Sequence, residues 1–137
     1  MDFSNIIGIS ASGMHSQAQR LQIASENLAN AETTGSAPGS DPYRRKTITF
    51  KEELDHTTGI SGVRVKEIGH DKSDFRMHYD PNHPAANAQG YVKMPNVNPL
   101  IEIMDSHDAQ HAYEANLNTM QITRAMLTRT INLMKSS

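Results

Sequence analysis

The C-terminal stretch from Tyr113 to Met134 carries the most regular apolar pattern of the chain. Its candidate inward positions alternate between spacings of four and three residues, which is the repeat of a coiled-coil seam. These positions are Tyr113, Leu117, Met120, Arg124, Leu127, Ile131 and Met134. A second series lies about 200° round the helix and consists of Ala115, Thr119, Ile122, Met126, Arg129 and Leu133. One partner helix covers one seam, so the pattern predicts another protein surface against the second.

A second long helix is predicted near the N-terminus, from Ser4 to about Ala31, and should end near Asn30. Small and apolar residues recur there at helical spacing, at Ile7, Ala11, Met14, Ala18, Leu21 and Leu28. Helical periodicity resumes at Pro99, which suits a first helical position after Asn98 as the N-cap. Two rods of this length are expected to pair antiparallel, with the first seam of the C-terminal helix against Ile7, Met14, Leu21 and Leu28.

The segment between the helices is predicted to be irregular and partly extended. A cluster of turn-forming residues occupies 32–42, and short strands are expected at 43–50, 60–68 and 76–79. Four of the six prolines fall at Pro81, Pro84, Pro95 and Pro99, a spacing that favours an extended arm.

These elements predict a mainly α fold with a small β insert. We expect a coiled-coil-like inner domain built from residues 1–31 and 99–137, and a short-stranded, Pro-rich middle insert at 32–98. Residues 1–31 hold 3 charged side chains, residues 32–98 hold 18 and residues 99–137 hold 7. Neutral helix surfaces suit contact with other protein, whereas the charged middle segment suits solvent.

Composition excludes several function classes. The formal net charge is −2, so nucleic acid and acidic membranes are not indicated as partners. There is no cysteine, hence no disulfide framework and no thiol nucleophile. No apolar run approaches the roughly 18 residues of a membrane span. An apolar fraction of 36% without any Trp predicts that the chain does not form a self-sufficient globule.

No catalytic constellation is found, and neither a small-molecule substrate nor a cofactor is expected. His107 and His111 are four residues apart, a spacing at which two imidazoles can share a metal. No third ligand is indicated nearby, so solvated or interface-packed histidines are the favoured interpretation. The acids and imidazoles between Asp71 and His83 are interpreted as a polar loop.

Three stretches resemble the rod and hook family of bacterial flagellar axial proteins. They are Ser25-Glu26-Asn27-Leu28-Ala29-Asn30-Ala31-Glu32-Thr33, then Tyr43-Arg44-Arg45-Lys46, and then Asp80-Pro81-Asn82 continued by Gly90-Tyr91-Val92-Lys93-Met94-Pro95-Asn96-Val97-Asn98. The last, followed by Tyr113-Glu114-Ala115-Asn116, is similar to proximal rod members of that family. In many axial proteins Thr-Pro-Gly-Tyr follows the Asn-Leu-Ala-Asn signature directly, whereas a longer loop separates Thr34 from Tyr43 here.

The resemblance implies a structural subunit of the basal-body proximal rod and no enzymatic activity. It implies that the terminal helices polymerise into a hollow drive shaft, which transmits torque and encloses an export channel. It also implies export by the flagellar type III apparatus, and the N-terminal residues lack the basic and apolar regions of a cleaved signal peptide. The expected location is the basal body across the periplasm. Implied partners are copies of this chain, other rod proteins, and ring and export-gate junction proteins.

The predicted assembly interface combines both helices. It comprises Ile7, Met14, Leu21, Asn27, Leu28, Asn30, Tyr113, Leu117, Met120, Ile122, Met126, Leu127, Ile131 and Leu133. Two alternatives remain open: a coiled-coil adaptor for a single partner, and a metal-binding enzyme or sensor that uses His107 and His111.

Overall fold

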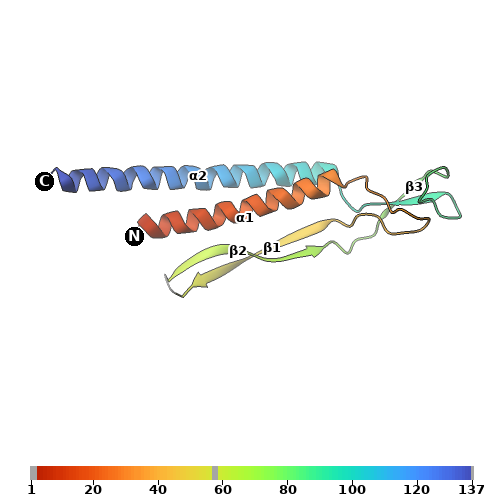
Figure 1. Cartoon of the computed structure of the whole chain (residues 1–137), viewed down its shortest axis with the longest axis horizontal. Helices are drawn as coiled ribbons and strands as arrows, with labels where there is room; N and C mark the ends of the chain where they lie inside the picture. Colours follow the sequence, from red (N-terminus) through yellow and green to blue (C-terminus); the bar gives the residue numbers. More distant parts are fainter. Residues whose placement is uncertain (1–2, 57–58, 137) are drawn as a thin grey trace.

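Two long helices dominate the computed structural model, which describes residues 3–56 and 59–136. Helix α1 spans Phe3–Ala29 and α2 spans Pro99–Lys135 (Figure 1). The Asn98 side chain caps α2 by accepting a hydrogen bond from the Leu100 amide at 3.1 Å. Both helices and their approximate ends follow the predicted pattern. The outermost residues of the predicted terminal segments, 1–2 and 137, lie outside the described part of the chain.

The two helices lie side by side and run in opposite directions. Asn27 contacts Glu102, Arg20 contacts Asp105, and the α-carbon of Gly13 lies close beneath the side chain of Asn116. Residue numbers thus rise along α1 while they fall along α2. A Cβ added at Gly13 would come within 2.9 Å of the Asn116 amide nitrogen, so glycine permits this close approach.

The line of α2 that is covered is offset from the predicted seam. Its buried residues are Glu102, Ala109 and Thr123, whereas Tyr113 and Ile131 each keep 37% of their surface exposed and Arg124 is also exposed. On α1, Leu21 and Leu28 are likewise 37% and 38% exposed. The seam that was predicted to face α1 is therefore only partly covered at these positions, and its pairing with Leu21 and Leu28 stays a prediction.

The covered line is offset because polar side chains on α2 form hydrogen bonds with backbone carbonyls of their own helix. Thr123 Oγ1 donates to the Thr119 carbonyl at 2.8 Å, and Asn116 Nδ2 donates to the Ala112 carbonyl at 2.9 Å. With these hydrogen bonds made inside its own helix, each side chain can face another helix at little cost. Small residues, and polar residues whose hydrogen bonds are made within α2, therefore lie between the two helices.

A long hairpin packs along α1. Strand β1, Lys46–Asp55, pairs antiparallel with β2, Ile60–His70, with an irregularity between Thr49 and Phe50. Ser16 Oγ donates to the Val63 carbonyl at 3.0 Å, and Ser12 Oγ accepts from the Val63 amide at 3.3 Å. Helix α1 therefore lies between α2 and the hairpin (Figure 1), which explains why so many of its residues are neutral and small.

A second, smaller sheet lies at the end of the molecule away from both termini (Figure 1). Strand β3, Arg76–Tyr79, was predicted, and it pairs antiparallel with β4, Tyr91–Met94. Strand β4 was missed, because the proline spacing around it suggested an extended arm without a partner. Val92, Pro95 and Val97 are among the most completely buried residues described.

The core is correspondingly thin. Its buried apolar residues are Ile23, Ala24, Ala31, Ala85, Val92, Val97 and Ala109. Most of these residues are small, and they are spread along the molecule instead of forming one cluster. No described helix is both long and apolar enough to cross a membrane.

Candidate functional site

A polar junction holds together the end of α1, the start of β1 and the start of α2. We define it by Asn27, Tyr43, Arg45, Lys46 and Glu102. Asn27, which is 1% exposed, lies at its centre and comes from the Asn-Leu-Ala-Asn stretch near the end of α1. The junction brings together residues that are up to 75 positions apart in sequence.

The Asn27 side chain uses its full hydrogen-bonding capacity. Its Oδ1 accepts from the Tyr43 hydroxyl and from the Lys46 amide, each at 2.8 Å. Its Nδ2 donates to the Lys46 carbonyl at 2.9 Å and to Glu102 Oε2 at 3.2 Å. Because an amide side chain offers two donors and two acceptor sites, no capacity is left for a group from outside the chain. Asn27 therefore fixes where β1 leaves the helical pair.

Glu102 is the most deeply buried charged residue described, at 1% exposure. Its carboxylate accepts from Arg45 Nε on one oxygen and from Asn27 on the other. The Arg45 guanidinium also lies 3.8 Å from carboxylate oxygens of Asp71 and Asp105. A buried charge is tolerated only when it is paired and hydrogen-bonded, so these contacts make the start of α2 depend on Arg45.

A second asparagine extends the junction toward the small sheet. Asn96 Oδ1 accepts from the Arg45 amide at 2.8 Å, and its Nδ2 donates to the carbonyls of Asp71 at 3.1 Å and Ser73 at 3.2 Å. Arg44 donates to the same two carbonyls and lies over the Phe75 ring, 4.2 Å from its centroid. The stretch Tyr43-Arg44-Arg45-Lys46 thus contributes a structural contact from each residue.

Local charges and burial shift several pKa values around the junction. The hydrogen bond from Lys46 Nζ to Glu26, at 2.7 Å, lowers the pKa of Glu26 and raises that of Lys46. The backbone amide of Ser73 donates to Asp71 at 2.8 Å and lowers the pKa of that carboxyl. Burial raises the pKa of the Tyr43 hydroxyl. Each shift favours the protonation state that holds the contact at neutral pH.

The arrangement positions elements of the chain and offers no reacting group. The Asn27 amide and the Glu102 carboxylate are engaged within the chain, so the junction acts as a structural tie. His107 and His111 are both exposed on α2, and the described residues contain no cluster of three potential metal ligands.

The residues predicted for an assembly interface fall into three groups. Asn27 and Asn30 have partners within the chain: Asn30 donates to the Glu26 carbonyl at 2.8 Å and accepts from Thr33 at 3.1 Å. Half-buried positions are Ile7, Met14, Leu117, Met120 and Leu127. More exposed positions are Leu21, Leu28, Tyr113, Ile122, Met126, Ile131 and Leu133.

Among the residues of the predicted interface, exposure is greatest on the second seam. Ile122, Met126 and Leu133 expose 57%, 54% and 69% of their surface. Another apolar cluster, which the predicted interface did not include, lies on the first turns of α2 and consists of Leu100, Ile101, Ile103 and Met104, all of them exposed. The signal was available, because apolar residues on several sides of one helix indicate a helix surrounded by protein.

The whole chain exposes far more surface than a compact monomer. Its accessible surface is 9238 Å², whereas a compact monomer of 15.2 kDa is expected to expose roughly 7,100 Å². Because large apolar side chains contribute to this surface, it is suited to burial against other protein molecules.

Two family models match the chain at its two ends. The model described as flagella basal body rod protein matches residues 7–35, which contain most of α1 and the Asn27 signature. The model described as flagellar basal body rod FlgEFG protein C-terminal matches residues 88–133, which contain β4 and nearly all of α2.

Similar proteins from distant bacteria match along almost the whole chain. A protein of Agrobacterium fabrum named flagellar basal-body rod protein FlgC is 53% identical over 129 residues, which is 94% of this chain and 93% of that protein. Proteins with the same name are 36% identical in Bacillus subtilis, over 94% of this chain and 96% of that protein, and 33% identical in Salmonella typhimurium, over 97% and 98%.

Proposed function

Because this chain belongs to the family of flagellar basal-body rod proteins and is a structural, non-enzymatic subunit of the basal body, we propose that it polymerises through its terminal helices. In this proposal the polymer is a hollow drive shaft that transmits torque and encloses the export channel. The observation that carries the proposal is the outward-facing apolar surface of α2, above all Ile122, Met126 and Leu133. A helix that leaves such side chains in water gains stability when another molecule covers them.

The proposed division of labour follows the charge distribution. Residues 1–31 and 99–137 form the inner helical part of the shaft, coiled-coil-like in its antiparallel pairing, and residues 32–98 with their proline-rich segment lie farther out. The few charges on the helices and the 18 charges of the middle segment support this arrangement.

The proposed interface has two sides. The seam at Tyr113, Leu117, Met120, Leu127 and Ile131 lies toward α1 and its Ile7, Met14, Leu21 and Leu28, and any surface left uncovered there is closed by a neighbouring subunit. The opposite seam lies wholly against neighbours. Asn27 and Asn30 contribute indirectly: their hydrogen bonds within the chain hold the shape of the surface that contacts neighbouring subunits.

Two arginines lie within these seams. Arg124 and Arg129 are exposed and form no ion pair with any described residue. We expect each guanidinium to meet a carboxylate or a carbonyl of another subunit, because charges in a protein interface need partners.

The chain assembles with other components of the basal body, and we propose which ones. Copies of itself and other rod proteins are the lateral and axial neighbours, with ring and export-gate junction proteins at the margins of the rod. Passage through the flagellar export apparatus, without a cleaved signal, delivers the chain to a rod that spans the periplasm.

Charge substitutions on the second seam test this proposal. Ile122→Asp or Met126→Asp should abolish assembly and motility, because a carboxylate would be buried without a partner in every contact. The unfolding free energy of the isolated chain should change by less than about 0.5 kcal/mol, since both sites are exposed in it. Met77→Asp on β3, at 52% exposure, is the matched control and should still assemble. Motile cells carrying Ile122→Asp would contradict the proposal.

A further inference from the structure

The last turns of α2 extend past the start of α1. Asn27 lies beside Glu102 and Gly13 beside Asn116, which defines the antiparallel register of the two helices. In the same register, Phe3 at the start of α1 lies about level with Met126. Figure 1 shows the C-terminal end of α2 projecting beyond the N-terminus. We call residues 127–135 the tail of α2. Ile131, Leu133 and Met134 in this tail expose 37%, 69% and 68% of their surface, so apolar groups face solvent on more than one side.

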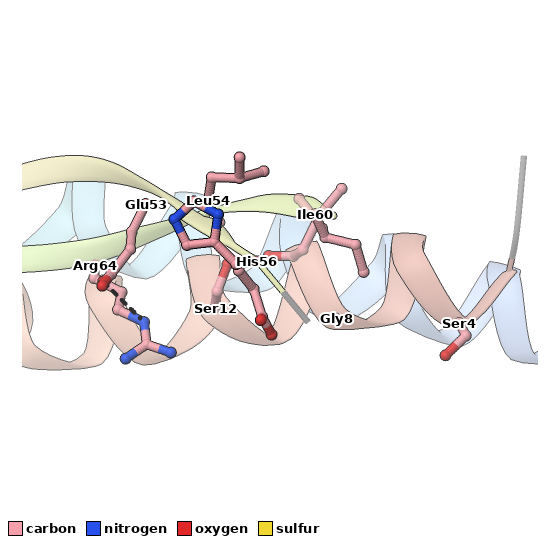
Figure 2. A pocket seen from close by; sticks show the side chains of 11 residues that line it. Ser4, Gly8, Ser12, Glu53, Leu54, His56, Ile60 and Arg64 are labelled. Atoms are coloured by element: carbon pink, nitrogen blue, oxygen red, sulfur yellow. Dashed lines mark hydrogen bonds and ion pairs between the residues drawn. The ribbon is translucent and has the colours of Figure 1, made fainter. Parts of the chain in front are cut away.

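A pocket of about 600 Å³ lies between the first turns of α1 and the end of β1 with the start of β2. Figure 2 shows Ser4, Gly8 and Ser12 lining it from α1, and Leu54 and Ile60 among those lining it from the hairpin. The helix side therefore consists of three small residues and Ile9, and the hairpin side combines Leu54 and Ile60 with charged residues. Ile9 and Leu54 are 46% and 47% exposed. Such a groove can accept large apolar side chains from outside.

Gly8 is the residue of this pocket that the chain itself does not explain. Glycine lowers the stability of a helix interior relative to alanine. At Gly13 and Gly62 a Cβ would approach Asn116 or Ser12, whereas at Gly8 it would meet nothing within 4 Å. Glycine at this position leaves room for another molecule to come close to the backbone of α1.

Charges on the tail and the pocket are complementary. Helix α2 carries no acid after Glu114, and its bases Arg124, Arg129 and Lys135 form no ion pair within the part of the chain that the structure describes. Among the described residues, the pocket lining contains the acids Glu53 and Asp55 and one arginine, Arg64. Glu53 pairs with Arg64 at 3.3 Å and with Lys51, just outside the lining, at 3.7 Å. Within the lining itself the carboxylates therefore outnumber the Lys and Arg side chains by one.

We propose that the pocket between α1 and the β1–β2 hairpin binds the tail of α2 from a second copy of this chain. The proposal rests on the polymerisation proposed above and specifies one of its contacts. The tail lies at the same end of the long axis as the first turns of α1 (Figure 1), which line the pocket, so the contact joins subunits that lie beside one another at similar height. Each subunit gives a tail to one neighbour and receives one from another, which is the heterologous contact that builds rings and helical arrays.

Disulfide cross-linking between two differently tagged full-length chains tests this contact, because the natural chain contains no cysteine. One chain carries Leu54→Cys and the other Met134→Cys, and copper-phenanthroline serves as the oxidant. The expected result is a disulfide between the two tags. The control pair, Met77→Cys with Met134→Cys, should give about tenfold less product, since Met77 is similarly exposed on β3 but lies far from the pocket. Equal yields from the two pairs, or a chain that stays monomeric at every concentration, would overturn the proposal.

Gly8→Leu tests the same contact by filling the pocket, and it should change helix content and disulfide yield in different directions. The substitution should leave or raise the helix content of the isolated chain by circular dichroism and should abolish the Leu54→Cys to Met134→Cys disulfide. Ala29→Leu, at an exposed position near the other end of α1, should preserve the disulfide. If Gly8→Leu still assembles while Ile122→Asp does not, the tail contact is wrong and the polymerisation proposal stands. If none of these substitutions affects assembly, both are wrong.

Discussion

The two ends of α2 differ in how their side chains are satisfied. At its start, Glu102 is buried and bound by Arg45 and Asn27 from the same chain. Toward its end, Met126 and Leu133 stand exposed, and the basic side chains have no described acid beside them. The first end is complete within one molecule, whereas we propose that the second is covered by another molecule. In this proposal a single helix joins a rigid junction to a surface that contacts neighbouring subunits.

The strongest test of the rigid end is removal of the Glu102 carboxylate. Glu102→Ala should lower the unfolding free energy by about 3–5 kcal/mol, because it leaves the Arg45 guanidinium without its closest partner and Asn27 without an acceptor. Denaturant titration of the isolated chain measures the loss. Glu114→Ala on an exposed turn of the same helix is the control, and its effect should stay within about 0.5 kcal/mol. Equal effects of the two substitutions would show that the junction does not stabilise α2.

Asn27→Ala should produce the next largest effect. It removes four hydrogen bonds and leaves the Lys46 amide and carbonyl without their partner, so we expect a loss of about 2–3 kcal/mol. Asn30→Ala, which removes one donor and one acceptor at a half-buried site, should cost about 1 kcal/mol or less. The difference between their denaturation midpoints separates the two asparagines of the signature. A larger loss for Asn30→Ala would contradict the central position assigned to Asn27.

Acid should weaken the junction before it affects the tail. The pKa values of Asp71 and Glu26 are lowered in the folded chain, so the stability they contribute is full above their unfolded values of 3.8 and 4.5 and is lost as pH falls through the folded values. The expected result is a modest decline in unfolding free energy below about pH 4.5, measured at constant ionic strength. Asp71→Asn should flatten part of this decline, and an unchanged profile would argue against the contact with Ser73.

The comparison of the two ends also explains which features were predictable from sequence. Both helices could be predicted from their helical periodicity and from the residues at their ends. Pro99 after Asn98 and the cluster of turn-forming residues after Ala31 are local signals. The scarcity of charge on α1 is explained in part by the hairpin, since Ser12 and Ser16 lie against it, while contact of the helices with other protein molecules stays a prediction. These inferences need only neighbouring residues or average composition.

Features that depend on distant partners were missed. Nothing local marks Glu102 as buried, because its partners Asn27 and Arg45 are 75 and 57 residues away. The apolar seam was offset because Asn116 and Thr123 hide their polar groups against their own helix. Strand β4 has only four residues, and its identity depends on β3 beside it.

Amide hydrogen exchange along α2, measured before and after assembly, tests the contrast most directly. The account predicts slow exchange at residues 102–109 in both states, because the junction holds them within the monomer. Residues 127–135 should exchange rapidly in the monomer and become protected on assembly. Strong protection of residues 127–135 in the monomer, as part of one cooperative unfolding transition, would contradict the claim that this end of α2 is completed by a neighbour.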